Sequence, residues 1–221
     1  MFDLTLTFDN GPEPSVTPRV LDILAERTIK ATFFVIGEKL GDPARRSLAV
    51  RARDEDHWIG NHTYTHTIPL GLRPNADTAE REIGRTQAAI GDLAHPQRWF
   101  RPFGGGGNLD TRLLKPSVVD YLKRNLHSCV LWNAIPRDWE DPDGWTERAL
   151  DQCSRRPWTL VVLHDLPTGA MDHLERFLDR AAAGGASFRQ DFPPQCVPIR
   201  NGEIALPIQD YVSSIEESIE S

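Results

Sequence analysis

Stretches typical of β-strands alternate along this chain with stretches of helical periodicity. Short apolar runs predict strands at residues 2–8, 31–36, 57–60, 98–100, 128–135 and 159–163. Apolar residues at helical spacing predict helices over 42–54, 117–125, 143–154 and 174–183, and two more that begin at Thr17-Pro18 and at the capping-box sequence of residues 77–80. Because strands joined by crossover helices run parallel, this alternation predicts an α/β fold, either a barrel or a doubly wound sheet. Residues 197–206 contain Asn201-Gly202, which predicts a hairpin.

Polar side chains follow the ends of the predicted strands. The first strand ends in Asp9 and Asn10, before the turn pair Gly11-Pro12. The carboxyl ends of parallel strands meet at one edge of the sheet, where barrel enzymes build their sites. We therefore expect one shared site to contain Asp9, His62, His66, Arg101, Asp138 and His164.

His62 and His66 are four residues apart. On a helical turn this spacing puts both imidazoles on one side, which is a common arrangement of metal ligands. Two surface histidines would have the same spacing, but this pair follows a strand and can share the edge with Asp9 and Asn10. A site of this kind suits hydrolysis: two histidines and a side-chain oxygen hold a divalent cation, which lowers the pKa of a bound water. A carboxylate then takes the proton of that water, and a histidine protonates the leaving amine.

Each of these residues also has a simpler interpretation. Asp9 could be a turn residue, His164 a buried core histidine and Arg101 a surface residue. The glycines at 104–107 could cradle a phosphate, but the Lys-Ser/Thr that completes a P-loop is missing. Trp132 and Trp139 could belong to the core or could stack on a sugar.

Composition excludes several classes of protein. The 221 residues are 39% hydrophobic, enough for one ordinary core, and we expect a single domain over 1–221 with a polar C-terminal segment at 207–221. The net charge of −7 and the scattered basic residues favour neither nucleic acid nor a membrane surface as partner. Three cysteines are too few for a disulfide framework, so we expect buried thiols. With no signal peptide and no apolar run of membrane-spanning length, a cytoplasmic protein is the simplest expectation.

The motifs resemble those of the polysaccharide deacetylase family, the carbohydrate esterases that remove N- or O-acetyl groups. Five of them occur in the family's order within residues 7–165. They are Thr-Phe-Asp-Asn-Gly-Pro at 7–12, His-Thr-Tyr-Thr-His at 62–66, Phe-Arg-Pro-Phe-Gly at 100–104, the Trp132 to Asp138-Trp139 stretch, and Leu-His-Asp at 163–165.

The resemblance implies a distorted (β/α)7-type barrel and a role for each matched residue. Asp9 would be the base and His164 the acid, with Arg101 and Asp138 as their respective orienting partners. Asn10, His62 and His66 would hold a divalent metal, most simply zinc. The backbone near Phe103 would help to stabilise the oxyanion, and Trp139 would contact the substrate.

Three positions depart from the family's pattern. Asn10 stands where the family has a metal-binding Asp, so the metal would have three neutral ligands and would bind more weakly or not at all. The Arg101 motif is one residue short and runs into the four glycines at 104–107, and Ile135 replaces the first Asp of the motif that ends in Asp138-Trp139.

We expect a hydrolase of amide bonds in small molecules or saccharides, most simply an N-deacetylase of amino sugars. Two alternatives follow from the departures: an allantoinase-like hydrolase of cyclic amides with weak or no metal dependence, and a catalytically silent domain that binds carbohydrate or a partner. A glycosidase with Asp9 and Asp138 as its carboxylate pair would leave the three histidines unexplained.

Overall fold

The computed structural model describes residues 1–214. Residues 215–221 lie outside the described part, and with them the second half of the segment predicted to be polar surface. The first half of that segment packs against the fold. Ile208 and Ser213 are buried, and Val212 forms a β-bridge with Leu114.

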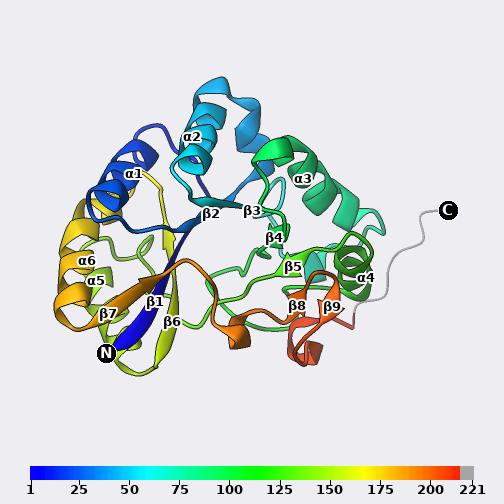
Figure 1. Cartoon of the computed structure of the whole chain (residues 1–221). Helices are drawn as coiled ribbons and strands as arrows, with labels where there is room; N and C mark the ends of the chain where they lie inside the picture. The colour runs from blue at the N-terminus through cyan, green and yellow to red at the C-terminus, as the bar shows by residue number, and fades with distance from the viewer. Residues whose placement is uncertain (215–221) are drawn as a thin grey trace.

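One curved sheet forms the centre of the molecule (Figure 1). Within residues 1–214 it has nine strands in the order β6-β1-β2-β3-β4-β5-β8-β9, and β7 pairs with β1. The predicted distorted barrel is confirmed: strands β1 to β6 run parallel, and an Ala134–Val161 bridge leads the chain after β5 back to β6. The strands are β1 (Phe2–Asp9), β2 (Thr32–Val35), β3 (Trp58–Asn61), β4 (Trp99–Phe100), β5 (Ser128–Cys129), β6 (Trp158–His164), β7 (Ala186–Arg189), β8 (Ile199–Arg200) and β9 (Glu203–Ile204).

Six α-helices of the described chain lie outside the sheet (Figure 1). They are α1 (Thr17–Glu26), α2 (Pro43–Asp54), α3 (Arg85–Ile90), α4 (Pro116–Arg124), α5 (Trp145–Ser154) and α6 (Leu174–Ala183). Their apolar faces cover the outer side of the strands, as the predicted crossovers require. The hairpin predicted at Asn201-Gly202 is present as β8 and β9.

Alternation along β1 and β6 decides which side chains reach the site. In β1, Leu4, Leu6 and Phe8 pack into the cluster that contains the apolar residues of α1 and α6. The intervening Asp9 therefore points to the other face of the sheet. Asp9 is the register partner of His164, the last residue of β6. The alternating pattern thus brings a carboxylate and an imidazole side by side at the carboxyl edge of the sheet.

Two predicted elements differ in the structure. The strand expected over 128–135 is only Ser128–Cys129, because the next two carbonyl groups accept hydrogen bonds from Arg101 instead of from a neighbouring strand. The helical segment begins at Thr78 and continues as a π-helical turn at Glu80–Gly84, but no capping-box hydrogen bond is found at residues 77–80. Asp77 instead pairs with Arg81.

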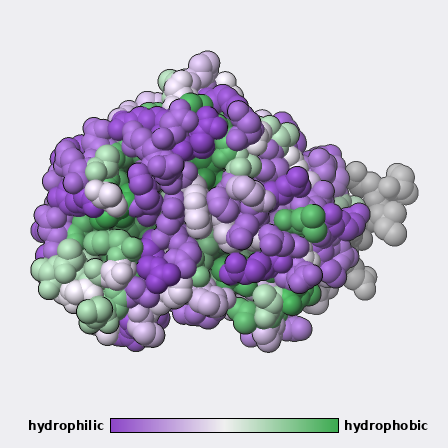
Figure 2. Space-filling model, viewed as in Figure 1, coloured by the Kyte–Doolittle hydropathy of each residue, from purple (hydrophilic) through white to green (hydrophobic). Residues whose placement is uncertain are grey.

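The surface is mostly hydrophilic on the face shown in Figure 2, where hydrophobic residues show only in separate patches. No helix within residues 1–214 has the length and apolar character needed to cross a membrane. The three cysteines are free and buried, as predicted.

Candidate active site

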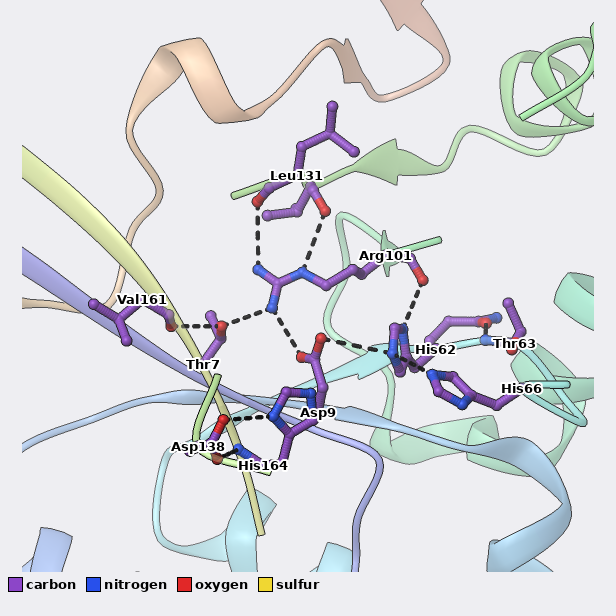
Figure 3. Close-up of polar contacts among 12 residues, drawn as sticks. Thr7, Asp9, His62, Thr63, His66, Arg101, Leu131, Asp138, Val161 and His164 are labelled. Atoms are coloured by element: carbon purple, nitrogen blue, oxygen red, sulfur yellow. Dashed lines mark hydrogen bonds and ion pairs between the residues drawn. The ribbon is translucent and has the colours of Figure 1, made fainter. Parts of the chain in front are cut away.

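Asp9 and Arg101 form a buried ion pair at the centre of the site (Figure 3). Arg101 Nη1 donates to Asp9 Oδ1 at 2.8 Å, and both side chains are at most 4% exposed. The guanidinium also donates to Thr7 Oγ1 and to the carbonyl oxygens of Val130 and Leu131. Burial lowers the pKa of Arg101, although the charge and the hydrogen bond of Asp9 raise it. A buried arginine fixed by this many acceptors leaves one orientation for the Asp9 carboxylate.

His164 is fixed by Asp138 in the same way. Asp138 Oδ1 lies 2.9 Å from His164 Nδ1, and Asp138 Oδ2 accepts the backbone N–H of His164 at 2.8 Å. Burial lowers the pKa of His164, but the charge of Asp138 and its hydrogen bond outweigh burial, so that the net shift is upward. Trp139 packs edge-on against the imidazole, with ring centroids 4.8 Å apart. The orienting pairs expected from the sequence are therefore both present.

The loop after β3 brings His62 and His66 together, but not on a helical turn as predicted. Thr63 and His66 have positive φ angles of 68° and 51°, which interrupt any helix. The two Nε2 atoms nevertheless lie 3.1 Å apart. His62 Nδ1 lies 2.9 Å from the Arg101 carbonyl oxygen and must donate to it, so its Nε2 has a free lone pair facing His66.

Burial keeps both of these imidazoles neutral. It lowers the pKa of His62 to about 3 and that of His66 to about 2. The neutral imidazole is the form that binds metal ions. The ring of Phe103 packs on His66 with centroids 4.0 Å apart, which limits the rotation of that ligand.

Asn10 has the other candidate ligand atom. Its backbone is left-handed, with φ of 74°, a conformation that asparagine and aspartate adopt more readily than most residues. Within the described chain its buried Oδ1 has no hydrogen-bond partner. Lys39 donates to the Asn10 carbonyl oxygen at 2.7 Å, so the main chain is fixed while the side-chain oxygen stays free.

These donors fit a divalent metal. Two nitrogen ligands of a tetrahedral zinc ion are separated by about 3.4 Å, close to the 3.1 Å between the histidine Nε2 atoms. An unpartnered buried oxygen on a residue that lines the same cavity as the two histidines is expected of a ligand position. Among residues 1–214, no three His, Cys, Asp or Glu side chains are grouped in a way that could bind a metal, so the third ligand here would have to be the neutral amide.

Glu82 is a site residue that the sequence analysis missed. Its buried carboxylate accepts the backbone N–H groups of Tyr64 and Thr65 and is paired with Arg73. It therefore fixes the loop between the two histidines from the segment before α3. Asn61 supports the same loop by accepting the Thr63 N–H. A lone acid in a helix full of charges gives no sequence signal for such a role.

A cavity of about 260 Å³ opens over these groups. Asp9, Asn10, His62, His66 and His164 all line it. The rest of its wall consists of the four glycines and apolar residues, namely Pro102, Phe103, Trp132, Ile135, Trp139, Val162 and Leu166. Trp132 therefore lines the cavity and is not simply a core residue.

Gly104 and Gly107 pack where a side chain would not fit. A Cβ on Gly104 would lie 2.5 Å from the Trp132 ring, and one on Gly107 would lie 2.7 Å from Ile135. The Trp132 indole N–H donates to the Gly107 carbonyl oxygen. These glycines build a cavity wall, and a phosphate cradle is not needed to explain them.

Comparison with known proteins gives the same result as the motifs. A family model described as "Polysaccharide deacetylase" matches residues 3–118. A chitooligosaccharide deacetylase of Rhizobium leguminosarum bv. phaseoli is 36% identical over 170 residues, which are 73% of this chain and 67% of that protein. A peptidoglycan-N-acetylglucosamine deacetylase of Bacillus cereus is 29% identical over 193 residues, covering 84% of this chain and 66% of the relative.

Solved structures agree on the fold. A peptidoglycan N-acetylglucosamine deacetylase in complex with 4-naphthalen-1-yl-N-oxidanyl-benzamide superimposes with a TM-score of 0.72 at 27% identity, over 88% of this chain and 87% of that one. A family 4 acetyl xylan esterase from Clostridium thermocellum, in complex with a cobalt ion, gives a TM-score of 0.67 at 26% identity, over 85% and 87% of the two chains.

The fold and these relatives define a carbohydrate-active hydrolase. The chain belongs to the polysaccharide deacetylase family and is an enzyme of that type.

Proposed function

We propose that this enzyme removes the acetyl group from an N-acetylated amino sugar by metal-assisted hydrolysis. The observation that carries the proposal is the pairing of Asp9 with His164 in register at one cavity, each fixed by its own charged partner. The relatives named as chitooligosaccharide and peptidoglycan deacetylases support the amide of an acetylated sugar as the bond that is cleaved.

The metal ligands in this proposal are His62 Nε2, His66 Nε2 and Asn10 Oδ1. When bound, a divalent ion such as zinc would supply a water of lowered pKa and polarise the substrate carbonyl. Because none of the three ligands is charged, we expect weaker metal binding than an aspartate at position 10 would give. The cobalt in the acetyl xylan esterase structure supports a divalent ion in a fold of this kind.

Asp9 acts as the base. Asp9 Oδ1 accepts a hydrogen bond from Arg101, whereas Asp9 Oδ2 lies 3.6 Å from His62 Nε2, on the side of the metal ligands. That oxygen takes one proton from the attacking water, whose oxygen forms the new bond to the acetyl carbon. Arg101 holds the carboxylate in this orientation through its hydrogen bond to Oδ1.

His164 acts as the acid. The proton on its Nε2 passes to the sugar nitrogen as the C–N bond breaks, so that acetate and a free amine leave. Asp138 holds the ring through Nδ1 and favours the imidazolium that this step needs. The Phe103 N–H, which donates to no acceptor within residues 1–214, is available to the oxyanion.

The apolar cavity wall suits the rest of the substrate. Trp132 and Trp139 line the same cavity as Asp9 and the three histidines and add aromatic surface to it. Sugar rings pack on such surfaces through their C–H faces while the polar groups fix the reacting amide.

Acetate release from N-acetylglucosamine oligomers tests the proposal directly. We expect turnover that depends on added zinc or cobalt and falls at least about 1,000-fold in Asp9→Asn and His164→Ala. Metal content should fall in His62→Ala but not in His164→Ala, which is a matched histidine removal in the same cavity.

Assays on the same enzyme preparation distinguish the two alternatives, a hydrolase of cyclic amides and a catalytically silent binding domain. Hydrolysis of a cyclic amide such as allantoin without metal, together with no acetate release, would favour the allantoinase-like reaction. Saccharide binding without turnover of either substrate would favour the silent domain.

A further inference from the structure

A second cavity adjoins the catalytic one across a thin wall. It has a volume of about 500 Å³, and it shares Gly106, Gly107, Trp132 and Ile135 with the catalytic cavity. The two cavities are therefore separated by the side chains of Trp132 and Ile135 and by the backbone of Gly106 and Gly107. We call this second cavity, which borders the catalytic cavity along these four residues, the arginine groove.

The groove is basic although the chain is acidic. Arg137, Arg155 and Arg156 line it, and none of its lining residues within the described chain is Asp or Glu. This contrasts with the net charge of −7 of the chain as a whole. A local excess of arginine in a hollow next to an active site favours an anionic ligand.

The three arginines differ in their freedom to bind a ligand. Arg137 is paired with Glu140 and also donates to the Gly106 carbonyl oxygen, so it braces the wall. Arg155 is paired with Asp151. Arg156 donates to the carbonyl oxygen of Gln152, and within residues 1–214 no carboxylate lies within 4.0 Å of its guanidinium. Arg156 is thus the group best placed to receive an anion.

Gln152 gives an independent indication of a polar ligand. Its amide N–H donates to the Ile135 carbonyl oxygen at 3.0 Å, which orients the side chain. Its Oε1 is buried and has no partner among the described residues. A buried acceptor at a groove wall matches a hydroxyl donor, which a saccharide has in abundance.

We infer that the arginine groove binds an anionic substituent, a carboxylate or a phosphate, on a saccharide whose acetylated amine lies over Asp9. The inference rests on the proposed function and adds a substrate class to it. Arg156 forms a charge-assisted hydrogen bond to the anion, Gln152 accepts from a sugar hydroxyl, and Arg137 keeps the shared wall in place. A neutral oligomer lacks the charge-assisted contact with Arg156.

Binding to a His164→Ala background, which removes the acid but leaves the groove intact, tests the inference by calorimetry. The ligands are a neutral N-acetylglucosamine tetramer, a matched tetramer with carboxyl-bearing sugars, and one with a phosphorylated sugar. We expect one of the two anionic oligomers to bind about ten- to a hundredfold more tightly than the neutral one, the gain of one hydrogen bond to a charged group. Whichever anionic oligomer gains identifies the source of the charge.

Arg156→Ala should reduce that affinity ratio toward one, and Arg156→Lys should restore part of it. Arg124→Ala removes an equal charge from an exposed site on α4 and should leave the ratio as it was. Equal affinity for all three oligomers, or a ratio that survives Arg156→Ala, would overturn the inference. If the active enzyme releases no acetate from any oligomer while the Arg156-dependent preference persists, the deacetylase proposal fails and the groove assignment stands.

Discussion

Replacing Asp138 with asparagine would separate the charge of this residue from its shape. Each carboxylate oxygen of Asp138 accepts one N–H of His164, from the ring Nδ1 and from the backbone. An asparagine has only one acceptor oxygen. If that oxygen keeps the backbone N–H, the amide N–H₂ group faces Nδ1 and forces the ring to lose its proton there. If that oxygen accepts from Nδ1 instead, the amide N–H₂ group faces the backbone N–H of His164, so that two donors oppose each other.

The expected magnitude follows from the same contacts. A hydrogen bond to a charged group contributes about 1.5–3 kcal/mol, and each pKa unit corresponds to about 1.4 kcal/mol. Loss of the 2.9 Å charge-assisted bond should therefore lower the pKa of His164 by about one to two units. Burial, which lowers that pKa in the wild type, is then opposed only by the charges of Asp9 and Asp165.

Two measurements test the expected fall in the pKa of His164. The acid must be protonated, so its titration sets the alkaline limb of the pH–rate profile, and that limb should move to lower pH by the same one to two units. An NMR titration of the His164 ring reads the pKa without any need for turnover. The His164 signal is easier to assign because burial lowers the pKa of His57, His62 and His127 to about 4, 3 and 4, so these rings titrate at lower pH.

If His164 of a folded Asp138→Asn variant titrates at the wild-type pH, the charge of Asp138 does not set the pKa of His164. A lower rate with an unmoved alkaline limb would lead to the same conclusion, since Asp138 would then act by position alone. His164→Ala has no imidazole to titrate at this position, so its residual profile identifies which limb belongs to His164.

Three further predictions follow. Asn10→Asp should bind zinc at least about tenfold more tightly, because a full negative charge replaces a dipole next to a dication; calorimetry with unchanged affinity would exclude Asn10 as a ligand. Arg101→Met should lose about 3–5 kcal/mol of stability in urea unfolding, because it leaves Asp9 buried without its partner. An Asp9→Asn plus Arg101→Met double variant whose loss equals the sum of the single losses would show that the pair is not coupled. Burial raises the pKa of Asp165 from 3.8 to about 7. The free energy of unfolding should therefore fall as pH rises from about 4 to 7, by at most about 4 kcal/mol. Asp165→Asn should remove this pH dependence.

The inward direction of Asp9 could be predicted because it depends only on strand periodicity. Leu4, Leu6 and Phe8 are all apolar, so their side of β1 had to be the buried outer face, and Asp9 had to lie on the other. The meeting with His164 follows, since residues that end neighbouring parallel strands lie at one edge. Local pattern was sufficient wherever a residue ended a regular element.

The loop that holds His62 and His66 could not be predicted in the same way. Spacing of four suggested a helical turn, but Thr63 and His66 have left-handed backbones. That conformation is stabilised by Asn61, which accepts the N–H of Thr63 two residues away, and above all by Glu82, which accepts two of the loop's N–H groups from a distant segment of the chain. The Glu82 contacts join residues about twenty positions apart and leave no periodic signal.

The shortened strand at 128–135 has a related cause. Its composition is that of a strand, yet the carbonyl oxygens of Val130 and Leu131 are used by Arg101. A buried guanidinium needs several acceptors, and it takes them from the nearest backbone. The residue that orients Asp9 therefore also ends the regular part of β5, so this departure from the predicted strand is a requirement of the site.

The geometry around Asn10 makes the charge of this position separable from its structure. Asparagine and aspartate both accept the left-handed backbone found here, and Lys39 binds the main-chain oxygen, not the side chain. An aspartate would therefore need neither a new backbone nor a new partner for Lys39. What changes is the charge at a side-chain oxygen that has no hydrogen-bond partner among the described residues. Any change in metal affinity on that substitution consequently measures the electrostatic contribution of the ligand and not a rearrangement of the loop.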